Sequence, residues 1–473
     1  MPGFFVENFG CRATQADGAA LERQFEERGL SRACSPAQAS VVILNTCTVT
    51  NGADQDARAA IRRVRRQNPE ARIVVTGCYA QRAPEEIASL PGVDLVVGNS
   101  HKHQLAEIAV PQLCPTASQS DFVLLEQLIE NREPRTENSI FVSDIFAHTE
   151  LLAAPVFDAA NERTRPNLKI QDGCDNRCSF CVIPYVRGQS RSLAPERIID
   201  EVTTLVNAGY REVVLSGINL GRWGRDFPNH ATTHVTRTAI NGSCERSSPV
   251  SLANLIRRIL TETSLEKLRI SSVEPMDWTD DLISLVASSP RIAKHAHVPM
   301  QSGSDAVLRR MHRKYRPWHY REKIRKIHAV MPQAAIGADV MVGFPGETDG
   351  EFESTRKMIE DLPFTYLHVF TYSPRPGTPA ADMGNQVPVH IARERNRILR
   401  ELASEKKLAF MRSFIGKKLE AITLNVVGND AQGEFTECLT DNYLKLRVHG
   451  RHEANRWVIV KVMNVVAGSL VGK

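Results

Sequence analysis

The sequence has no hydrophobic run long enough to cross a membrane, and we expect no secretory leader. In the 473 residues, no apolar stretch approaches the length of roughly 18 residues that a membrane-spanning helix needs. The first ten residues lack a basic region, a long apolar segment and a small-residue cleavage site. We therefore expect a soluble, cytoplasmic protein without membrane association, whose ten cysteines stay reduced.

A strong charge of one sign is also missing. The formal net charge is +5, with 24% charged and 42% hydrophobic residues, which describes an ordinary globular protein. This charge is compatible with a polyanionic partner but does not by itself indicate one. A chain of this length is expected to contain two or three domains.

Three of the cysteines are closely spaced. Cys174, Cys178 and Cys181 form a C-x3-C-x2-C motif on a loop expected to follow a strand at residues 167–171. Soft thiolates at this spacing suit iron–sulfur or zinc chemistry. A structural zinc site needs a fourth ligand, but the next cysteine, Cys244, lies in a polar insertion. Zinc is therefore the weaker interpretation.

Two other kinds of metal site are excluded by the residues after Cys181. Haem attachment requires His directly after Cys-x-x-Cys, and Val182 occupies that position. Bacterial ferredoxin spacing requires a further Cys followed by Pro, which is absent. The motif, with Phe180 before its last cysteine, resembles that of radical S-adenosylmethionine (SAM) enzymes. The resemblance implies a [4Fe–4S] cluster on three thiolates, whose fourth iron binds the amino and carboxylate groups of SAM.

The first 110 residues alternate between apolar runs and helical patterns, which predicts a small parallel α/β sheet. Cys11, Cys47 and Cys78 each follow an expected strand. Since ligands gather at the carboxyl ends of parallel strands, these side chains can converge. Gly10 and Gly77 precede two of them and permit a close backbone turn. From the residues alone, either a second three-thiolate cluster or three small buried cysteines is possible.

The surrounding segments favour the cluster. Residues 45–51 (Asn-Thr-Cys-Thr-Val-Thr-Asn), Gly10-Cys11 and residues 77–81 resemble the N-terminal domain of the methylthiotransferases. This implies an auxiliary [4Fe–4S] cluster on Cys11, Cys47 and Cys78. The remaining cysteines match no motif position and are interpreted as incidental: Cys34, Cys114, Cys244 and Cys438.

A predicted helix at residues 52–66 carries five arginines: Arg58, Arg62, Arg63, Arg65 and Arg66. These guanidinium groups could hold phosphates beside the auxiliary cluster. A solvated basic face is the alternative.

The rest of the chain divides into three segments. Residues 111–160 contain several prolines and little periodicity, so we expect a linker there between an N-terminal domain at 1–110 and a core at 161–398. The core has six strand–helix units, and the resemblance implies a partial (β/α)6 radical SAM barrel. The polar residues 227–249 are expected to form a surface loop within it.

Residues 413–473 show short alternating runs that predict a small antiparallel β-barrel. This segment resembles the TRAM domain, an RNA-binding module; an ordinary β capping domain is the alternative. On the RNA-binding interpretation, these basic residues contact phosphates: Lys417, Lys418, Lys445, Arg447, Arg451, Arg456 and Lys461.

The carboxyl ends of the barrel strands should face the cofactor. The segments there match those of the family in the same order, and the resemblance implies SAM contacts for seven residues. These are Phe180, Ser216, Gly217, Ser272, Glu274, Gln301 and Val342.

Taken together, the resemblance implies a tRNA methylthiotransferase with two [4Fe–4S] clusters and SAM. The cluster on Cys174, Cys178 and Cys181 would generate a deoxyadenosyl radical, and the auxiliary cluster would present methylated sulfur to carbon two of adenine. Within the family, residues 45–51 and 169–174 look most like the branch that acts on threonylcarbamoyladenosine beside the anticodon. The alternatives are the isopentenyladenosine branch and a non-catalytic iron–sulfur RNA-binding or sensing protein. Expected partners are the tRNA anticodon loop and an electron donor such as flavodoxin or ferredoxin.

Overall fold

The computed structural model describes residues 3–110, 139–148, 151, 164–227, 250–430 and 433–473. It divides into two compact units, Met1–Ala154 with Ile183–Gly188, and Pro155–Val182 with Gln189–Lys473. Among the described residues, no helix has both the length and the apolar character needed to cross a membrane. Cys114, Cys244 and most of residues 111–160 and 227–249 lie outside the described residues.

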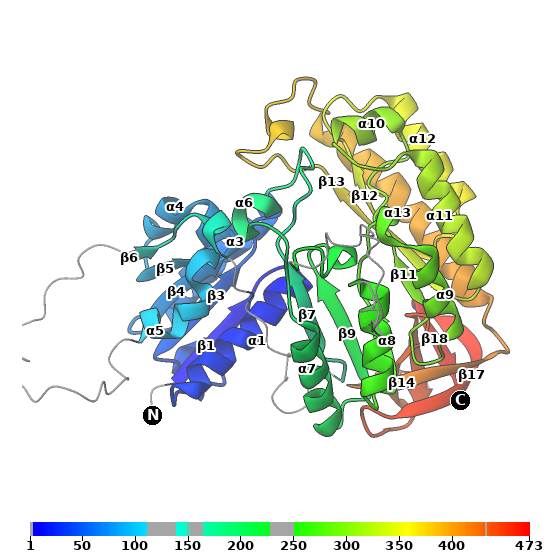
Figure 1. Ribbon diagram of the computed structural model, residues 1–473, viewed down its shortest axis with the longest axis horizontal. Coiled ribbons are helices and arrows are strands. Elements are labelled where there is room, and N and C mark those ends of the chain that lie inside the picture. Colours follow the sequence, from blue (N-terminus) through cyan, green and yellow to red (C-terminus); the bar gives the residue numbers. More distant parts are fainter. Residues whose placement is uncertain (1–2, 111–138, 149–150, 152–163, 228–249, 431–432) are drawn as a thin grey trace, which may run out of the picture. The chain divides into compact units, whose positions relative to one another are not determined.

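The first unit contains a six-stranded parallel sheet in the order β2-β1-β3-β4-β5-β6 (Figure 1). The strands are β1 (Gly3–Asn8), β2 (Ser31–Arg32), β3 (Val41–Thr46), β4 (Arg72–Gly77), β5 (Leu95–Gly98) and β6 (Ser139–Phe141). The central strand β3 is a continuous buried run, typical of a parallel sheet covered on both faces.

Helices cover both faces of this sheet. They are α1 (Arg12–Glu27), α2 (Asn51–Gln67), α3 (Cys78–Arg82), α4 (Pro84–Ala88), α5 (Leu105–Ala109) and α6 (Ile183–Arg187). On one face, Ile61 and Val64 of α2 pack in a core with Val42 and Leu44. On the other, Phe25 of α1 packs with residues of α5 and with the alternate side chains of β3. The side-chain alternation of β3 thus supplies both cores.

β6 and α6 are among the elements of this unit that were not expected. β6 lies in the segment predicted as a linker, and it extends the sheet by pairing with β5. Its three residues are all exposed, so no hydrophobic pattern marks it. The helix α6 follows Cys181 closely and belongs to this unit, although the residues on both sides of it belong to the second.

The second unit contains six parallel strands: β7 (Asn167–Asp172), β9 (Glu212–Gly217), β10 (Lys267–Ile270), β11 (His295–His297), β12 (Ala335–Val342) and β13 (Tyr366–Thr371). They form sheets in the orders β10-β9-β7-β8 and β11-β12-β13, joined by parallel bridges such as Ser272 to His297. β8 (Arg191–Ser192) is antiparallel to β7 and ends the sheet on that side. This confirms an open, partial barrel.

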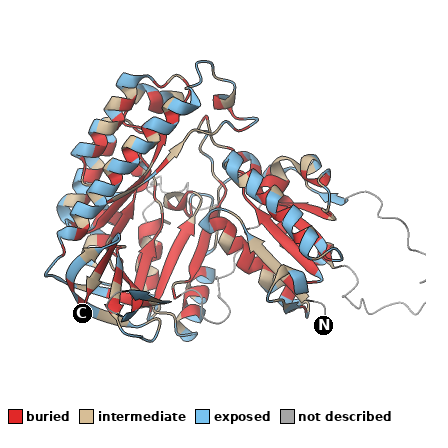
Figure 2. Ribbon diagram, turned by 180° about the vertical axis from the view of Figure 1, so that it is seen from behind, coloured by how far each residue is buried: buried red, intermediate tan, exposed pale blue. Residues whose placement is uncertain are grey.

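Helices cover the outer side of these strands (Figure 1). They are α7 (Pro195–Asn207), α8 (Leu252–Glu262), α9 (Asp280–Ser288), α10 (Asp305–Arg310), α11 (Pro317–Val330), α12 (Asp349–Asp361) and α13 (Val389–Arg412). α12 begins with a capping box between Thr348 and Glu351, which stabilises its start. Figure 2 shows that most of these strands are buried, whereas the outward faces of the helices are exposed; β13 is mostly half-buried.

The C-terminal residues form a closed five-stranded barrel in the order β14-β15-β16-β18-β17. Its strands are β14 (Lys418–Asp430), β15 (Gly433–Thr440), β16 (Lys445–His449), β17 (Trp457–Val466) and β18 (Ser469–Gly472). The barrel was expected, but β18 was not, and β18 pairs in parallel with β16. A tight turn with positive φ at Ala467 and Gly468 separates β17 from β18.

This small barrel packs against the amino-terminal ends of the parallel strands. Lys267, the first residue of β10, forms ion pairs with Glu420 at 2.9 Å and Asp441 at 3.3 Å. Arg269 is buried, pairs with Glu212 at 2.6 Å and donates to the Asp441 carbonyl at 3.1 Å. One end of the parallel barrel is thereby covered, which leaves the carboxyl ends of the strands for a ligand.

Candidate functional site

The first unit places three free cysteines at the carboxyl ends of neighbouring strands. Cys11 follows β1, Cys47 follows β3, and Cys78 is the first residue of α3 after β4. Gly10 has φ +101°, and a Cβ atom there would lie 2.5 Å from Cys47 Cβ. The two loops therefore approach so closely that only glycine fits at this position.

The environment of these thiols suits metal-bound thiolates. Burial, together with the neighbouring Cys78 and Cys11 sulfurs, raises the pKa of Cys47 to about 12. Ionisation of such a thiol needs a positive partner, and a bound metal deprotonates a coordinating thiol. Asn99 Nδ2 donates to Cys78 Sγ at 3.6 Å, and Thr14 Oγ1 lies 3.6 Å from Cys11 Sγ. Three soft donors at the ends of three neighbouring strands thus fit an iron–sulfur group.

The second unit carries the other three cysteines on the loop after β7. Cys174, Cys178 and Cys181 are free and half-buried. Asn219 Nδ2 donates to Cys174 Sγ at 3.7 Å, and Arg313 Nη1 donates to Cys178 Sγ at 3.3 Å. Burial raises the pKa of Cys174, an effect opposed by donors from the Asn176 backbone and Asn219. The side chains of Asn219 and Arg313 both stabilise sulfur that carries negative charge. The three cysteines of this loop therefore also fit an iron–sulfur group.

Hydrogen bonds hold this loop in place. Gln171 Nε2 donates at 2.9 Å to the carbonyls of Asp172 and Gly173 and to Ser190 Oγ, while its Oε1 accepts from Asn219 N at 2.7 Å. Ser179 Oγ donates to the Arg310 carbonyl at 2.7 Å. The loop that presents the sulfurs is therefore fixed by groups on both sides of it.

Most of the predicted cofactor contacts lie around this loop. Phe180 is half-buried and packs edge-to-face on Phe344, with ring centroids 6.4 Å apart. Ser216 and Gly217 end β9, and a Cβ atom on Gly217 would lie 2.9 Å from Gln171 Oε1. The carboxylate of Glu274 forms an ion pair with Arg313, the residue that also contacts Cys178.

Gln301 has two features typical of a ligand site. Its backbone adopts φ +63°, a conformation that non-glycine residues adopt only at a cost in energy. The residue is 7% exposed, and the buried Oε1 has no hydrogen-bond partner among the described residues. A buried acceptor of this kind is expected to find its partner in a ligand.

Val342 and Ser272, which were also predicted to contact the cofactor, lack the two features of Gln301. Val342 lies on β12 on the opposite face from Asp339 and is fully buried in the core with Val340 and Ala338. The period-two alternation of a strand turns this side chain into the core, and the contact of Val342 with the cofactor stays a prediction. Ser272 is half-buried and forms the bridge to His297.

A pocket opens beside Cys178. It is lined by residues of both charge signs: Asn176, Cys178, Arg222, Glu274, Met276, Asp277, His312, Arg313, Lys314 and Tyr315. Asp277 lies 2.7 Å from Arg225, and burial raises its pKa. Such a mixture suits the ammonium and carboxylate groups of an amino acid.

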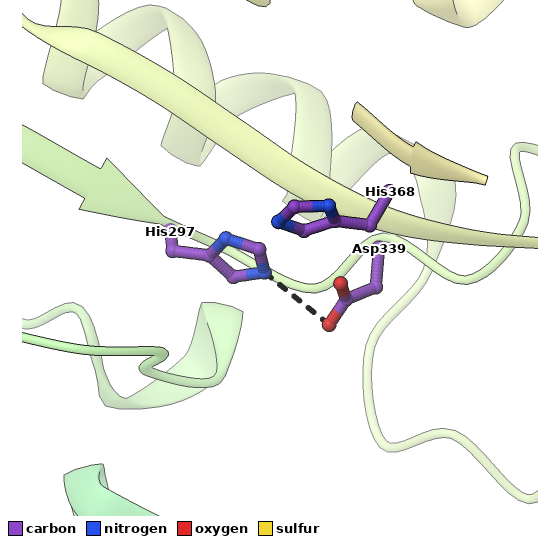
Figure 3. Close-up of side chains that lie close together, drawn as sticks. All are labelled: His297, Asp339 and His368. Atoms are coloured by element: carbon purple, nitrogen blue, oxygen red, sulfur yellow. Dashed lines mark ion pairs between the residues drawn. The ribbon is translucent and has the colours of Figure 1, made fainter. Parts of the chain in front are cut away.

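Three polar residues gather on the inner face of β11, β12 and β13 (Figure 3). His297 Nε2 lies 3.2 Å from Asp339 Oδ2, and Asp339 is the register partner of His368. Burial of Asp339 opposes its ionisation, but the hydrogen bond from His297 and the positive charges of His297, His368 and Arg313 lower its pKa. Tyr366 Oη lies 3.0 Å from His297 Nδ1, which fixes the ring. These groups give the barrel lumen a polar lining.

Sequence reasoning did not select Arg313, His297 or His368. It placed Asn219 and Asp339 in strand-end segments that face the cofactor but gave neither residue a role. A charged residue inside the apolar strand β12 was an available signal for Asp339. Arg313 lies 135 residues from Cys178 in sequence, and no local pattern connects the two.

Comparisons with known proteins agree with this geometry. Residues 3–98 match the family described as Uncharacterized protein family UPF0004, and residues 168–359 match the Radical SAM superfamily. The chain also shares its fold with the radical SAM methyltransferase TsrM from Kitasatospora setae, with a TM-score of 0.52 and 14% identity over 80% of this chain and 77% of TsrM.

Curated relatives align over nearly the whole chain. The threonylcarbamoyladenosine tRNA methylthiotransferase MtaB of Bacillus subtilis is 36% identical and covers 97% of this chain and 93% of its own. The corresponding MtaB of Aquifex aeolicus is 35% identical, with coverages of 96% and 99%. The tRNA-2-methylthio-N(6)-dimethylallyladenosine synthase of Ehrlichia canis is 32% identical, with coverages of 92% and 90%. The chain therefore belongs to the radical SAM methylthiotransferases, in the MtaB branch of that family.

Proposed function

We propose that this protein inserts a methylthio group at carbon two of threonylcarbamoyladenosine, next to the anticodon of tRNA. The observation that carries the proposal is the pair of cysteine triads, one at the strand ends of each unit, in a chain 36% identical to MtaB over nearly its full length. Two [4Fe–4S] clusters and SAM are the cofactors. Bound together, they supply radical chemistry able to activate an adenine C–H bond that acid–base catalysis cannot reach.

In the second unit, Cys174, Cys178 and Cys181 hold the cluster that binds SAM. Arg313 and Asn219 donate to two of these sulfurs and stabilise their negative charge. We assign the amino-acid end of SAM to the pocket beside Cys178, where Glu274 and the nearby cations can pair with its ammonium and carboxylate groups.

Further SAM contacts are assigned to Ser216, Gly217, Ser272 and Gln301, with Phe180 packing beside the loop. Gln301 is the strongest of these assignments, because its buried Oε1 needs a donor and an amide can read a ribose hydroxyl or an amino group. The polar lumen around Asp339 excludes a purely hydrophobic ligand from this part of the barrel.

In the first unit, Cys11, Cys47 and Cys78 hold the auxiliary cluster, which presents sulfur to the adenine. Thiol ligands remain available only in a reducing compartment, so we assign the enzyme to the cytoplasm. We further propose flavodoxin or ferredoxin as the electron donor.

The C-terminal barrel is proposed to bind tRNA. Lys418 of β14 and Lys461 of β17 are direct register partners, both exposed, and Lys417 lies next to Lys418. No ion pair to these three lysines occurs among the described residues. Like charges placed opposite each other destabilise a sheet, so a polyanion that neutralises them supplies a reason for the arrangement.

The arginines of α2 contribute less than expected. Arg58 pairs with Glu86, Arg63 with Glu7 and Arg65 with Asp94, so their charges are engaged within the protein. Arg62 and Arg66 are exposed and have no ion pair among the described residues, and they remain candidates for phosphate contacts.

The second candidate is the isopentenyladenosine branch. It is supported by the 32% identity to the dimethylallyladenosine synthase of Ehrlichia canis, and disfavoured by the higher identity to MtaB. A non-catalytic iron–sulfur sensor is disfavoured because it would not need the pocket beside Cys178 or the buried acceptor of Gln301.

Nucleoside analysis of tRNA from a deletion strain tests the proposal. We expect loss of methylthio-threonylcarbamoyladenosine, accumulation of threonylcarbamoyladenosine and an unchanged level of the isopentenyl derivative. Restoration by the parent gene, but not by a Cys178→Ala gene, is the matched control. An unchanged nucleoside profile would contradict the proposed function.

A further inference from the structure

A buried charged cluster lies in the first unit, within α1, α6 and the 3₁₀ helix η2 (Asn99–Gln104). Lys102 Nζ and Arg187 Nη2 both donate to the same oxygen, Oδ2 of Asp17, each at 3.0 Å. Lys102 is 3% exposed, Asp17 1% and Arg187 2%. Two cations are thus removed from water around one shared carboxylate oxygen.

This cluster adjoins the N-terminal cysteines. Lys102 Nζ also donates to Asn45 Oδ1 at 3.2 Å, and Asn45 is two residues before Cys47. Asn99, on the same 3₁₀ helix as Lys102, donates through Nδ2 to Val186 O at 2.7 Å and to Cys78 Sγ at 3.6 Å. The backbone next to Arg187 is thereby connected to a cysteine sulfur by a single amide group.

The ammonium of Lys102 has three donors, and two of them are engaged by Asp17 and Asn45. A buried cation costs free energy unless a nearby anion compensates it. Neutral thiols at Cys47 and Cys78 supply no such charge, whereas three thiolates around an iron–sulfur group do. The excess positive charge of Lys102 and Arg187 is therefore better compensated when the unit holds an iron–sulfur group than when its thiols are free.

A purely structural ion pair is the alternative, and the same unit contains one for comparison. Arg65 pairs with Asp94 at 2.5 Å and donates to the carbonyls of Pro69, Ala71 and Gly92. It lies near the start of β4, because Asp94 also accepts from Ile73 N, whereas Cys78 follows the end of that strand. Arg65 is thus a partly buried, well-bonded cation at the other end of the sheet.

We propose that Lys102, seated with Arg187 on Asp17, is a positioning residue whose positive charge stabilises the anionic iron–sulfur group on Cys11, Cys47 and Cys78 and raises its reduction potential. This proposal rests on the proposed function only because that function places an iron–sulfur group on Cys11, Cys47 and Cys78. One-electron reduction adds a negative charge to this group, so a buried cation favours the reduced form over the oxidised form. Removing the cation must therefore shift the midpoint potential to a more negative value.

The test uses full-length protein with Cys174, Cys178 and Cys181 replaced by Ala, so that only the N-terminal cluster is present. Midpoint potentials are measured by redox titration with electron paramagnetic resonance for this parent, Lys102→Met, Lys102→Arg and Arg65→Met. Lys102→Met removes the charge at similar volume, Lys102→Arg keeps it, and Arg65→Met removes a distant cation. Iron content and circular dichroism are recorded for each.

We expect a more negative midpoint for Lys102→Met, and midpoints equal to the parent for the other two variants. A folded Lys102→Met that fails to load iron while Arg65→Met loads fully would also support the proposal, because the anionic group then depends on this charge. A loaded Lys102→Met at the parent potential would overturn it, as would Lys102→Arg shifting as far as Lys102→Met. A parent without iron would overturn the auxiliary-cluster assignment itself, which distinguishes the two failures.

Discussion

Arg313 Nη1 lies 3.3 Å from Cys178 Sγ, so a buried guanidinium contacts the sulfur at the centre of the C-x3-C-x2-C motif. The other end of the same guanidinium pairs with Glu274. The side chain of Arg313 therefore connects Cys178, a proposed cluster ligand, to the carboxylate of Glu274, which we propose to bind SAM.

Replacing Arg313 by Met should reduce deoxyadenosine formation by about 10- to 100-fold, the usual cost of losing a group that supports metal ligands. It should also lower the free energy of unfolding by about 3 kcal/mol, because Glu274 loses its buried partner. Arg313→Lys keeps the charge and should retain more of the activity. Deoxyadenosine is measured by chromatography after reduction with dithionite, and full activity in Arg313→Met would refute the assigned role.

Iron content distinguishes two clusters from one. The reconstituted chain should bind about eight irons, and replacement of Cys174, Cys178 and Cys181 by Ala should leave about four. Replacing the incidental Cys34 and Cys438 instead should change nothing. Iron and sulfide analyses provide the measurement, and a triple variant with its full iron content would disprove the assignment of these cysteines.

The two triads should differ in their effect on the reaction. Replacing Cys11, Cys47 and Cys78 by Ala should leave deoxyadenosine formation close to that of the parent, since SAM binds only the other cluster, and should abolish methylthio product. Both products are quantified by mass spectrometry from one incubation. Loss of both activities in a variant that is folded by circular dichroism would show that the N-terminal triad is not auxiliary.

Salt dependence tests the RNA-binding surface. Replacing Lys417, Lys418 and Lys461 by Gln should weaken tRNA binding and reduce the slope of log affinity against log salt by roughly one for each phosphate that the protein no longer neutralises. Lys445→Gln is the control, because Lys445 already pairs with Glu437 at 3.4 Å. An unchanged slope in the triple variant would place the tRNA elsewhere on the protein.

The sequence was sufficient to predict features that arise from local pattern. The buried run of β3 and the helical periodicity of α2 predicted the N-terminal sheet, and the place of Cys11, Cys47 and Cys78 after strands predicted where they lie. The comparison with relatives confirmed the family that the cysteine motifs suggested.

Features that depend on tertiary contact could not be predicted in this way. Arg313 reaches Cys178 and Arg187 reaches Asp17 across 135 and 170 residues of sequence, so neither contact has a local signature. β6 and β18 are too short for a hydrophobic period.

The central claim is tested most directly by incubating the reconstituted enzyme with SAM, a reductant and tRNA that carries either threonylcarbamoyladenosine or isopentenyladenosine. The tRNA is then digested to nucleosides and analysed by mass spectrometry. We predict a methylthio group on the threonylcarbamoyl nucleoside and little or none on the isopentenyl nucleoside. A methylthio group on the isopentenyl nucleoside alone would contradict the branch assignment, and its absence from both would contradict the account of this protein as a tRNA methylthiotransferase.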